Sequence, residues 1–167
     1  RTIRETAAAD LADRLEIHEL LEVAGDVPVR LRIGDGEREA VGAVMTAARA
    51  AGVDDRLWLA HDDLEVLSEW RDIAPEVHLI NSTSLAKLPF GAESRAAELA
   101  AARVDAIALA ESDWTGGMVT LFHRFDVLAF ADGAHYERQL ARVIDMGVDA
   151  VSGDHADRMA AVAATFD

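Results

Sequence analysis

The stretch Ala141–Val162, ARVIDMGVDAVSGDHADRMAAV, contains the pattern that decides the fold of this chain. A helical segment ends at Met146–Gly147, a short apolar strand follows, and Gly153–His155 leads into another helix. A glycine just after a helix is typical of an end in the left-handed conformation, which glycine adopts at little cost. The stretch therefore predicts a helix, a strand, a polar turn and a second helix.

The same unit recurs along the chain. Each short apolar run is followed by a polar turn and a helical segment, and successive runs start roughly 20 to 28 residues apart, which suits βα units with short loops. The runs are nearly continuous in apolar residues, as expected for parallel strands covered on both faces. The predicted strands are residues 29–33, 56–61, 76–82, 104–112, 126–132 and 148–155.

Two α/β architectures fit six parallel βα units: an open doubly wound sheet, and a (β/α)₈ barrel with two units fewer. A dinucleotide-binding sheet should carry a glycine-rich loop after its first strand. The segment Gly34–Ala40, GDGEREA, lacks the GxGxxG spacing, and no P-loop occurs. Periodicity alone leaves the choice between the two architectures open.

Composition excludes several classes of function. The 167 residues include 31 acidic and 16 basic side chains, a net charge of −15, which disfavours binding to nucleic acid or to an anionic membrane. No segment reaches the 18 apolar residues of a transmembrane helix. The chain has no cysteine, hence no disulfide and no thiolate nucleophile, which fits a cytoplasmic protein. We expect a single domain over residues 1–167.

The C-terminal two-thirds of the chain resembles the C-terminal part of glycerophosphodiester phosphodiesterases, most closely their actinobacterial-type branch. The resemblance rests on Leu57–Ser82, on VLAFAD at Val127–Asp132, and above all on HYERQLARVIDMGVDAVSGDHADRM at His135–Met159. It extends diffusely over about residues 9–163.

The resemblance implies a TIM (β/α)₈ barrel, of which the six strands would be strands 3 to 8. It implies hydrolysis of a small-molecule glycerophosphodiester to an alcohol and glycerol 3-phosphate, in lipid and glycerol metabolism. In the family a pair of histidines supplies acid–base catalysis, and a divalent metal, Mg²⁺ or Ca²⁺, neutralises the phosphate.

The chain departs from the family pattern at its functional residues. The His-Arg-Gly motif, which the family has at the end of strand 1, is absent. Arg32 stands where strand 3 of the family carries a metal-binding glutamate, Gly34 replaces a lysine, and Phe130 replaces a tryptophan. A guanidinium cannot bind a metal ion. Two explanations remain open: the barrel lacks its N-terminal strands here, or it is a degenerate, non-catalytic barrel that binds a phosphorylated ligand.

Polar residues at the ends of the predicted strands are the candidates for a substrate pocket, because active sites of such barrels lie at the carboxyl ends of the strands. Turn chemistry or helix capping explains several of them equally well or better, notably Asp154 and the Asp62–Asp63 pair. The candidates are Arg32, His61, Asn81, Glu111, Asp113, Trp114, Asp132, Asp154 and His155. We expect no complete metal site in this chain.

The most specific expectation concerns Arg32. If the alignment is right, its side chain points into the barrel near the carboxyl ends of the strands, on the same face of its strand as Arg30. A buried arginine needs a carboxylate or an anion beside it. We therefore expect Arg32 to contact Glu111, Asp113, Asp154 or a bound anion.

Overall fold

A computed structural model describes residues 17–24, 27–34 and 38–166 of the chain. It contains six parallel strands that pair in sequence order, with no reversal. This confirms the number and order of the predicted strands and excludes a doubly wound sheet. The last strand, predicted over residues 148–155, is only Ala150–Val151, and Glu111 and Ser112, predicted as strand, form a 3₁₀ turn. The strands are β1 (Val29–Arg32), β2 (Leu57–His61), β3 (His78–Ser82), β4 (Ala106–Ala110), β5 (Leu128–Asp132) and β6 (Ala150–Val151).

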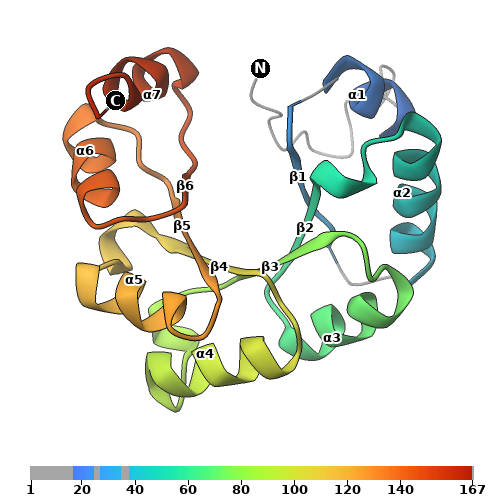
Figure 1. Ribbon diagram of the computed structural model, residues 1–167, viewed down its shortest axis with the longest axis horizontal. Coiled ribbons are helices and arrows are strands. Elements are labelled where there is room, and N and C mark those ends of the chain that lie inside the picture. Colours follow the sequence, from blue (N-terminus) through green and yellow to red (C-terminus); the bar gives the residue numbers. More distant parts are fainter. Residues whose placement is uncertain (1–16, 25–26, 35–37, 167) are drawn as a thin grey trace.

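Helices cover the convex face of the curled sheet (Figure 1). Within the described residues, β1 and β6 are the edge strands and do not pair with each other, so the sheet is a half-barrel. The α-helices are α1 (Ile17–Ala24), α2 (Arg38–Ala51), α3 (Leu64–Ile73), α4 (Gly91–Ala101), α5 (Gly116–His123), α6 (Glu137–Asp145) and α7 (Ala156–Ala163). Short 3₁₀ turns, η2 (Asp54–Arg56), η3 (Leu85–Lys87) and η4 (Glu111–Asp113), precede β2 and follow β3 and β4.

The two faces of the sheet have different environments. Odd-numbered strand residues such as Leu59 and Leu79 pack against buried helix residues such as Trp70, and they form the main core. Even-numbered residues face the concave side, where small side chains such as Ala106 and Ala108 pack in a second cluster. Because side chains alternate along a strand, the parity of a residue decides whether it meets helices or the concave side.

A repeated Val-Asp-Ala sequence fixes the start of two strands. The N–H of Asp105 donates to the carbonyl of Leu79 at 3.0 Å, and its carboxylate accepts the N–H of Leu79 at 2.7 Å. Asp149 makes the same two bonds to Ala129, at 2.8 and 2.7 Å. Each aspartate therefore satisfies both polar groups of one residue on the preceding strand, which sets the parallel register at the amino ends.

Arg71 extends this arrangement into the core. It lies on α3, is only 7% exposed, and its guanidinium donates to the Asp105 carboxylate at 2.6 Å. It also donates to the carbonyls of Pro75, Val77 and Arg103 at 2.8 to 2.9 Å. One cation thus satisfies three chain carbonyls and a carboxylate at the junction of α3, β3 and β4.

The turn between β6 and α7 requires glycine at position 153. A Cβ atom on Gly153 would lie 2.3 Å from the backbone oxygen of Ala134, which is far inside van der Waals contact. Ala134 is held in place because its N–H donates to the carbonyl of Ser152 at 3.0 Å. The turn as it stands therefore has no room for a side chain at position 153.

We expect Gly153→Ala to lower the free energy of unfolding by about 1–2 kcal/mol, because backbone must move to make room. Gly42→Ala is the matched control: nothing lies within 4 Å of a Cβ there, and Gly42 is inside α2. That control should be neutral or stabilising by about 0.5–1 kcal/mol. Urea denaturation measures both, and equal effects would contradict the steric account.

Candidate functional site

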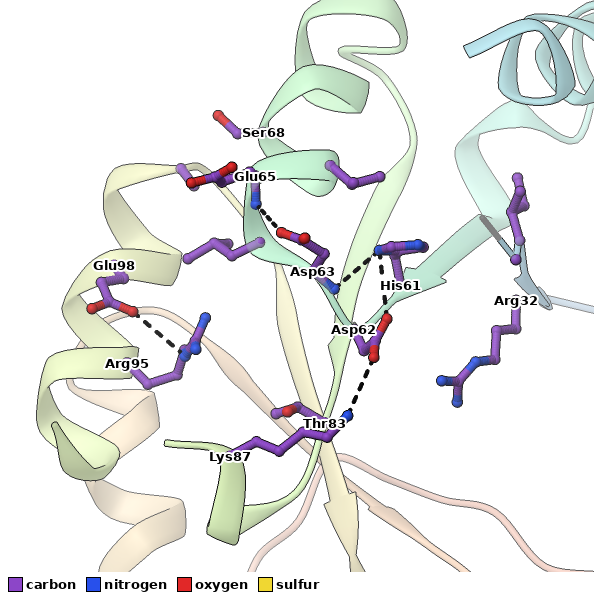
Figure 2. Close-up of a pocket in the computed structure, with 15 residues that line it drawn as sticks. Arg32, His61, Asp62, Asp63, Glu65, Ser68, Thr83, Lys87, Arg95 and Glu98 are labelled. Carbon is purple, nitrogen blue, oxygen red and sulfur yellow. Dashed lines mark hydrogen bonds and ion pairs between the residues drawn. The ribbon is translucent and has the colours of Figure 1, made fainter. Parts of the chain in front are cut away.

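A polar hollow of about 390 Å³ opens at the carboxyl ends of β1, β3, β4 and β5. We call five of its polar residues the mouth: Arg32, Asp62, Ser82, Lys87 and Asp132. Thr83 and Ser84 also line the hollow. A wider hollow of about 1110 Å³ adjoins it and shares Arg32, Asp62 and Lys87 (Figure 2). The smaller volume falls within the roughly 300–1,000 Å³ range of small-molecule pockets.

An ion pair spans the concave side beside the mouth. The guanidinium of Arg30 on β1 donates to both carboxylate oxygens of Asp132 on β5, at 2.6 and 2.9 Å. The hydroxyl of Ser152 also donates to Asp132, at 2.7 Å. The two side chains are about one-third exposed. Asp132 is therefore a candidate that the structure does place at the mouth, and there its carboxylate is fully engaged.

Arg32 lies at the mouth on the same face as Arg30, as expected. Its side chain is exposed, and among the described residues its hydrogen bond is to the hydroxyl of Ser82, at a long 3.5 Å. The expected pairing of Arg32 with Glu111, Asp113 or Asp154 is wrong. The carboxylate that lies across the sheet is that of Asp132, and it forms its ion pair with Arg30. Arg32 consequently keeps most of its donors available to solvent or to a ligand.

Lys87 and Asp62 complete the mouth from the loops after β3 and β2. Lys87 is the only lysine of the 167 residues, and its ammonium lies 3.4 Å from the Asp62 carboxylate. Figure 2 shows the ammonium of Lys87 and the guanidinium of Arg32 directed toward the same space beside Asp62. Burial raises the pKa of Asp62, but the hydrogen bond and charge of Lys87 outweigh it, so the pKa lies below its usual value. Asp62 is therefore ionised at neutral pH.

We expect Lys87→Met to raise the pKa of Asp62, because burial remains while the neighbouring cation is lost. In the native protein the lowered pKa stabilises the fold above the unfolded-state pKa, and this is lost as the pH falls through the folded-state pKa. The pair is exposed, so its contribution is only about 0.5 kcal/mol. Carboxyl NMR titration measures the shift. An unchanged Asp62 pKa in Lys87→Met would contradict the pairing.

His61 and Asn81 are not mouth residues, although His61 lines the wider hollow. Both belong to the odd-numbered strand residues, whose side chains face the helices. There the ring of His61 packs edge-on against Trp70, with 5.3 Å between the ring centres. The Nδ1 atom of His61 accepts the N–H of Asp63 at 3.0 Å. The amide of buried Asn81 donates to the carbonyl of Asp62 at 2.9 Å. Both side chains shape the turn after β2.

The cap of α3 is Asp63, whose carboxylate accepts the N–H of Glu65 at 2.8 Å. The capping interpretation of the Asp62–Asp63 pair is therefore right for the second residue only. Since adjacent residues point in different directions, capping by Asp63 leaves the Asp62 carboxylate free to turn toward Lys87. Asp62 is thus a mouth residue that the sequence analysis did not identify, because it interpreted Asp62 and Asp63 together as a helix cap.

Three further candidates, at the end of β4, have structural contacts: Glu111, Asp113 and Trp114. Glu111 forms an ion pair with Arg142 of α6 and accepts from Gln139 at 2.7 Å. Asp113 accepts the N–H of Leu85 at 3.2 Å. Trp114 is buried at 1% exposure, and its indole N–H donates to the carbonyl of Phe130 at 2.9 Å. The expected pocket wall at Trp114 is wrong, because the ring lies in the core.

Asp154 and His155 lie in the turn before α7 and are exposed. The Asp154 carboxylate is 3.2 Å from Nδ1 of His135, and its side chain is 73% exposed. His155 occupies the N-cap position of α7, but its side chain makes no capping hydrogen bond. The expected cap at Asp154 is therefore wrong, and neither residue lines the mouth.

Three of the described groups near the mouth are cations, Arg30, Arg32 and Lys87, and two are carboxylates, Asp62 and Asp132. The mouth itself is balanced, with Arg32 and Lys87 against Asp62 and Asp132, and Arg30 beside it adds one positive charge, whereas the whole chain carries −15. Two interactions already neutralise the carboxylates, whereas Arg32 has no ionic partner among the described residues. Cations beside hydroxyl groups form a site that suits an anion, above all one with several oxygens such as phosphate.

Among the described residues, no group of three or more His, Asp or Glu side chains is arranged so that it could hold a metal ion. None of the helices that the structure describes has the length and hydropathy needed to cross a bilayer.

A portion of a (β/α)₈ barrel, with polar side chains at the carboxyl ends of its strands, is the class that this fold defines. Among solved structures, glycerophosphodiester phosphodiesterases share it. The enzyme from Parabacteroides distasonis matches with a TM-score of 0.70 at 14% identity, over 90% of this chain and 65% of its own. The enzyme from Agrobacterium tumefaciens matches with a TM-score of 0.67 at 18% identity, over 89% and 61%.

A phosphodiesterase from Oleispira antarctica, solved with its product sn-glycerol 3-phosphate, matches with a TM-score of 0.63 at 15% identity. The match covers 75% of this chain and 49% of that one. No protein-family model and no curated protein matches the sequence. The resemblance to glycerophosphodiester phosphodiesterases is confirmed at the level of the fold, and this chain spans between half and two-thirds of the length of these structures.

Proposed function

We propose that this chain is the phosphate-binding part of a hydrolase that cleaves glycerophosphodiesters to an alcohol and sn-glycerol 3-phosphate. The observation that supports the proposal most is the coincidence of two features. The fold is shared with glycerophosphodiester phosphodiesterases, and a cation-bearing hollow lies at the carboxyl ends of the strands, where barrels of this kind bind their ligands.

The mouth residues have distinct roles in this proposal. Arg32 and Lys87 contact the phosphate oxygens, and their charge stabilises the negative charge that builds up as the diester bond breaks. Asp62 is ionised at neutral pH, so it accepts a hydrogen bond from a glycerol hydroxyl and does not serve as an acid. The acid–base pair that hydrolysis needs is not among the mouth residues, so hydrolysis is proposed for the whole protein.

The divalent metal that the resemblance implies does not fit the described carboxylates. Asp132 is held by Arg30 and Ser152, and Asp62 lies beside Lys87. A metal ion would have to displace a cation from each, and Arg32 stands where a ligand is expected. No catalytic step is therefore assigned to a metal on these residues.

A second candidate is a non-catalytic barrel that binds a phosphorylated ligand. It is favoured by Arg32, which supplies a cation at the position that the resemblance assigns to a metal-binding glutamate. Both candidates use the same mouth, and they differ only in whether the diester bond is cleaved.

One assay separates the two candidates. The protein in its natural length is incubated with glycerophosphocholine, with Mg²⁺, with Ca²⁺ and with EDTA, and released glycerol 3-phosphate is measured enzymatically. Release above the buffer control supports the hydrolase. Binding of glycerol 3-phosphate without release supports the non-catalytic barrel, and absence of both overturns the two proposals together.

A further inference from the structure

Arg32 and Lys87 form a pair of cations that no described anion balances in full. Arg32 has a single hydrogen bond among the described residues, to Ser82 at 3.5 Å, and its guanidinium is exposed. Among the described residues, the Lys87 ammonium pairs with Asp62 at 3.4 Å, and its side chain is 65% exposed. Arg32 is at the end of β1 and Lys87 is in the turn after β3, yet both side chains line both hollows.

The residues that frame this pair fix its geometry. Arg30 holds Asp132 in a bidentate contact and lies 3.4 Å from the Ser82 hydroxyl, so Ser82 stands between the two arginines. With Asp132 neutralised by Arg30, the carboxylate does not compete for Arg32. The guanidinium fork of Arg32 is therefore left to bind two oxygens of one ligand.

We infer that the mouth binds a phosphate group directly through Arg32, Lys87 and Ser82, and that this binding needs no divalent metal. The inference rests on the proposed phosphate site but not on hydrolysis. Two phosphate oxygens accept from the Arg32 fork, another accepts from Lys87, and the Ser82 hydroxyl donates to the ligand.

Asp62 determines which phosphate fits best. The ionised carboxylate repels the phosphate group of either ligand, but the alcohol hydroxyls of glycerol 3-phosphate can donate to Asp62 while its phosphate stays on Arg32 and Lys87, and inorganic phosphate has no such second group. The mouth should therefore bind the phosphate of a polyol more tightly than inorganic phosphate, and both through the same cations.

Calorimetric titration of the natural-length protein tests the inference. The probes are sn-glycerol 3-phosphate and inorganic phosphate, each in EDTA and again with Mg²⁺ or Ca²⁺. We expect binding in EDTA, tighter for glycerol 3-phosphate and weakened by added salt because exposed charges are screened. Arg32→Met and Lys87→Met should each weaken glycerol 3-phosphate binding at least about tenfold, the effect of one charged hydrogen bond.

Arg124→Met is the matched control, because Arg124 is exposed at the end of α5 and lines neither hollow. It should leave the affinity unchanged, and Lys87→Arg should retain most of it. Circular dichroism checks that each variant is folded. Binding that appears only with a divalent ion, no binding in EDTA, or equal affinity in the two mouth variants and the wild type would each overturn the inference.

The outcome is separable from that of the proposed function. Metal-free binding without hydrolysis would leave this inference standing and remove the hydrolase. Hydrolysis together with strictly metal-dependent binding would overturn this inference and leave the proposed hydrolase standing.

Discussion

Replacing Arg71 with methionine should lower the free energy of unfolding by about 3–4 kcal/mol. The methionine fills similar space but donates no hydrogen bond. The carbonyls of Pro75, Val77 and Arg103 would then lose their donor. Asp105 would lose its cation while still accepting the N–H of Leu79. The contact to the Val77 carbonyl is buried, and a buried acceptor left without a partner costs about 1–3 kcal/mol. The contacts to Pro75 and Arg103 are partly buried and Asp105 is partly solvated, which limits the total.

Arg49→Met is the control for this prediction. Arg49 also pairs with a carboxylate, Glu76, but both side chains are exposed. The arginine hydrogen bond lowers the pKa of Glu76, yet a surface pair of this kind contributes little to stability because solvent screens it. Chemical denaturation of both variants decides the matter. If Arg71→Met cost no more than Arg49→Met, the proposed junction of α3, β3 and β4 would be refuted.

Removing the ion pair across the concave side should have the second-largest effect. We expect Arg30→Met to cost about 2–3 kcal/mol, because Asp132 would keep its charge and only the Ser152 hydroxyl as a partner. One-third exposure of both side chains reduces the penalty below that of a fully buried pair. The same variant should weaken phosphate binding, because the freed Asp132 carboxylate would compete for Arg32.

A double-mutant cycle isolates the pair. Asp132→Leu in the Arg30→Met background removes the uncompensated charge, so the double variant should be more stable than the sum of the single effects predicts, by about 1–2 kcal/mol. Urea denaturation provides the four free energies. Strict additivity would show that Arg30 and Asp132 do not interact across the sheet.

The strands and their order could be predicted because their signals are local. Apolar runs, the glycine at position 147 and the spacing of units all lie within short windows, and Gly147 indeed has a φ of +83°. Resemblance to a known family then selected the barrel from two architectures that periodicity left open. These features needed no knowledge of which residues meet across the fold.

The site was harder to predict for two reasons. The face to which a strand-end side chain points depends on the exact register of its strand, and residues far apart in the sequence meet at the site. His61 and Asn81 end their strands, but a shift of one residue turns a side chain to the other face. Arg30 and Asp132 are 102 residues apart, and no local pattern joins them. Trp114 is an aromatic at a strand end that proves to be core. Lys87 had one signal that could have revealed it, as the only lysine, placed just after a strand.

The central claim is that the mouth holds the phosphate of a glycerol phosphate, and Lys87 provides the most direct probe. Reductive methylation with ¹³C-formaldehyde labels lysine amines while keeping their charge, and Lys87→Arg assigns the Lys87 signal. On addition of sn-glycerol 3-phosphate in EDTA, the account predicts that the Lys87 methyl signal shifts saturably, because the bound phosphate then lies beside the ammonium. A Lys87 signal that stays unchanged at saturating sn-glycerol 3-phosphate would contradict the claim.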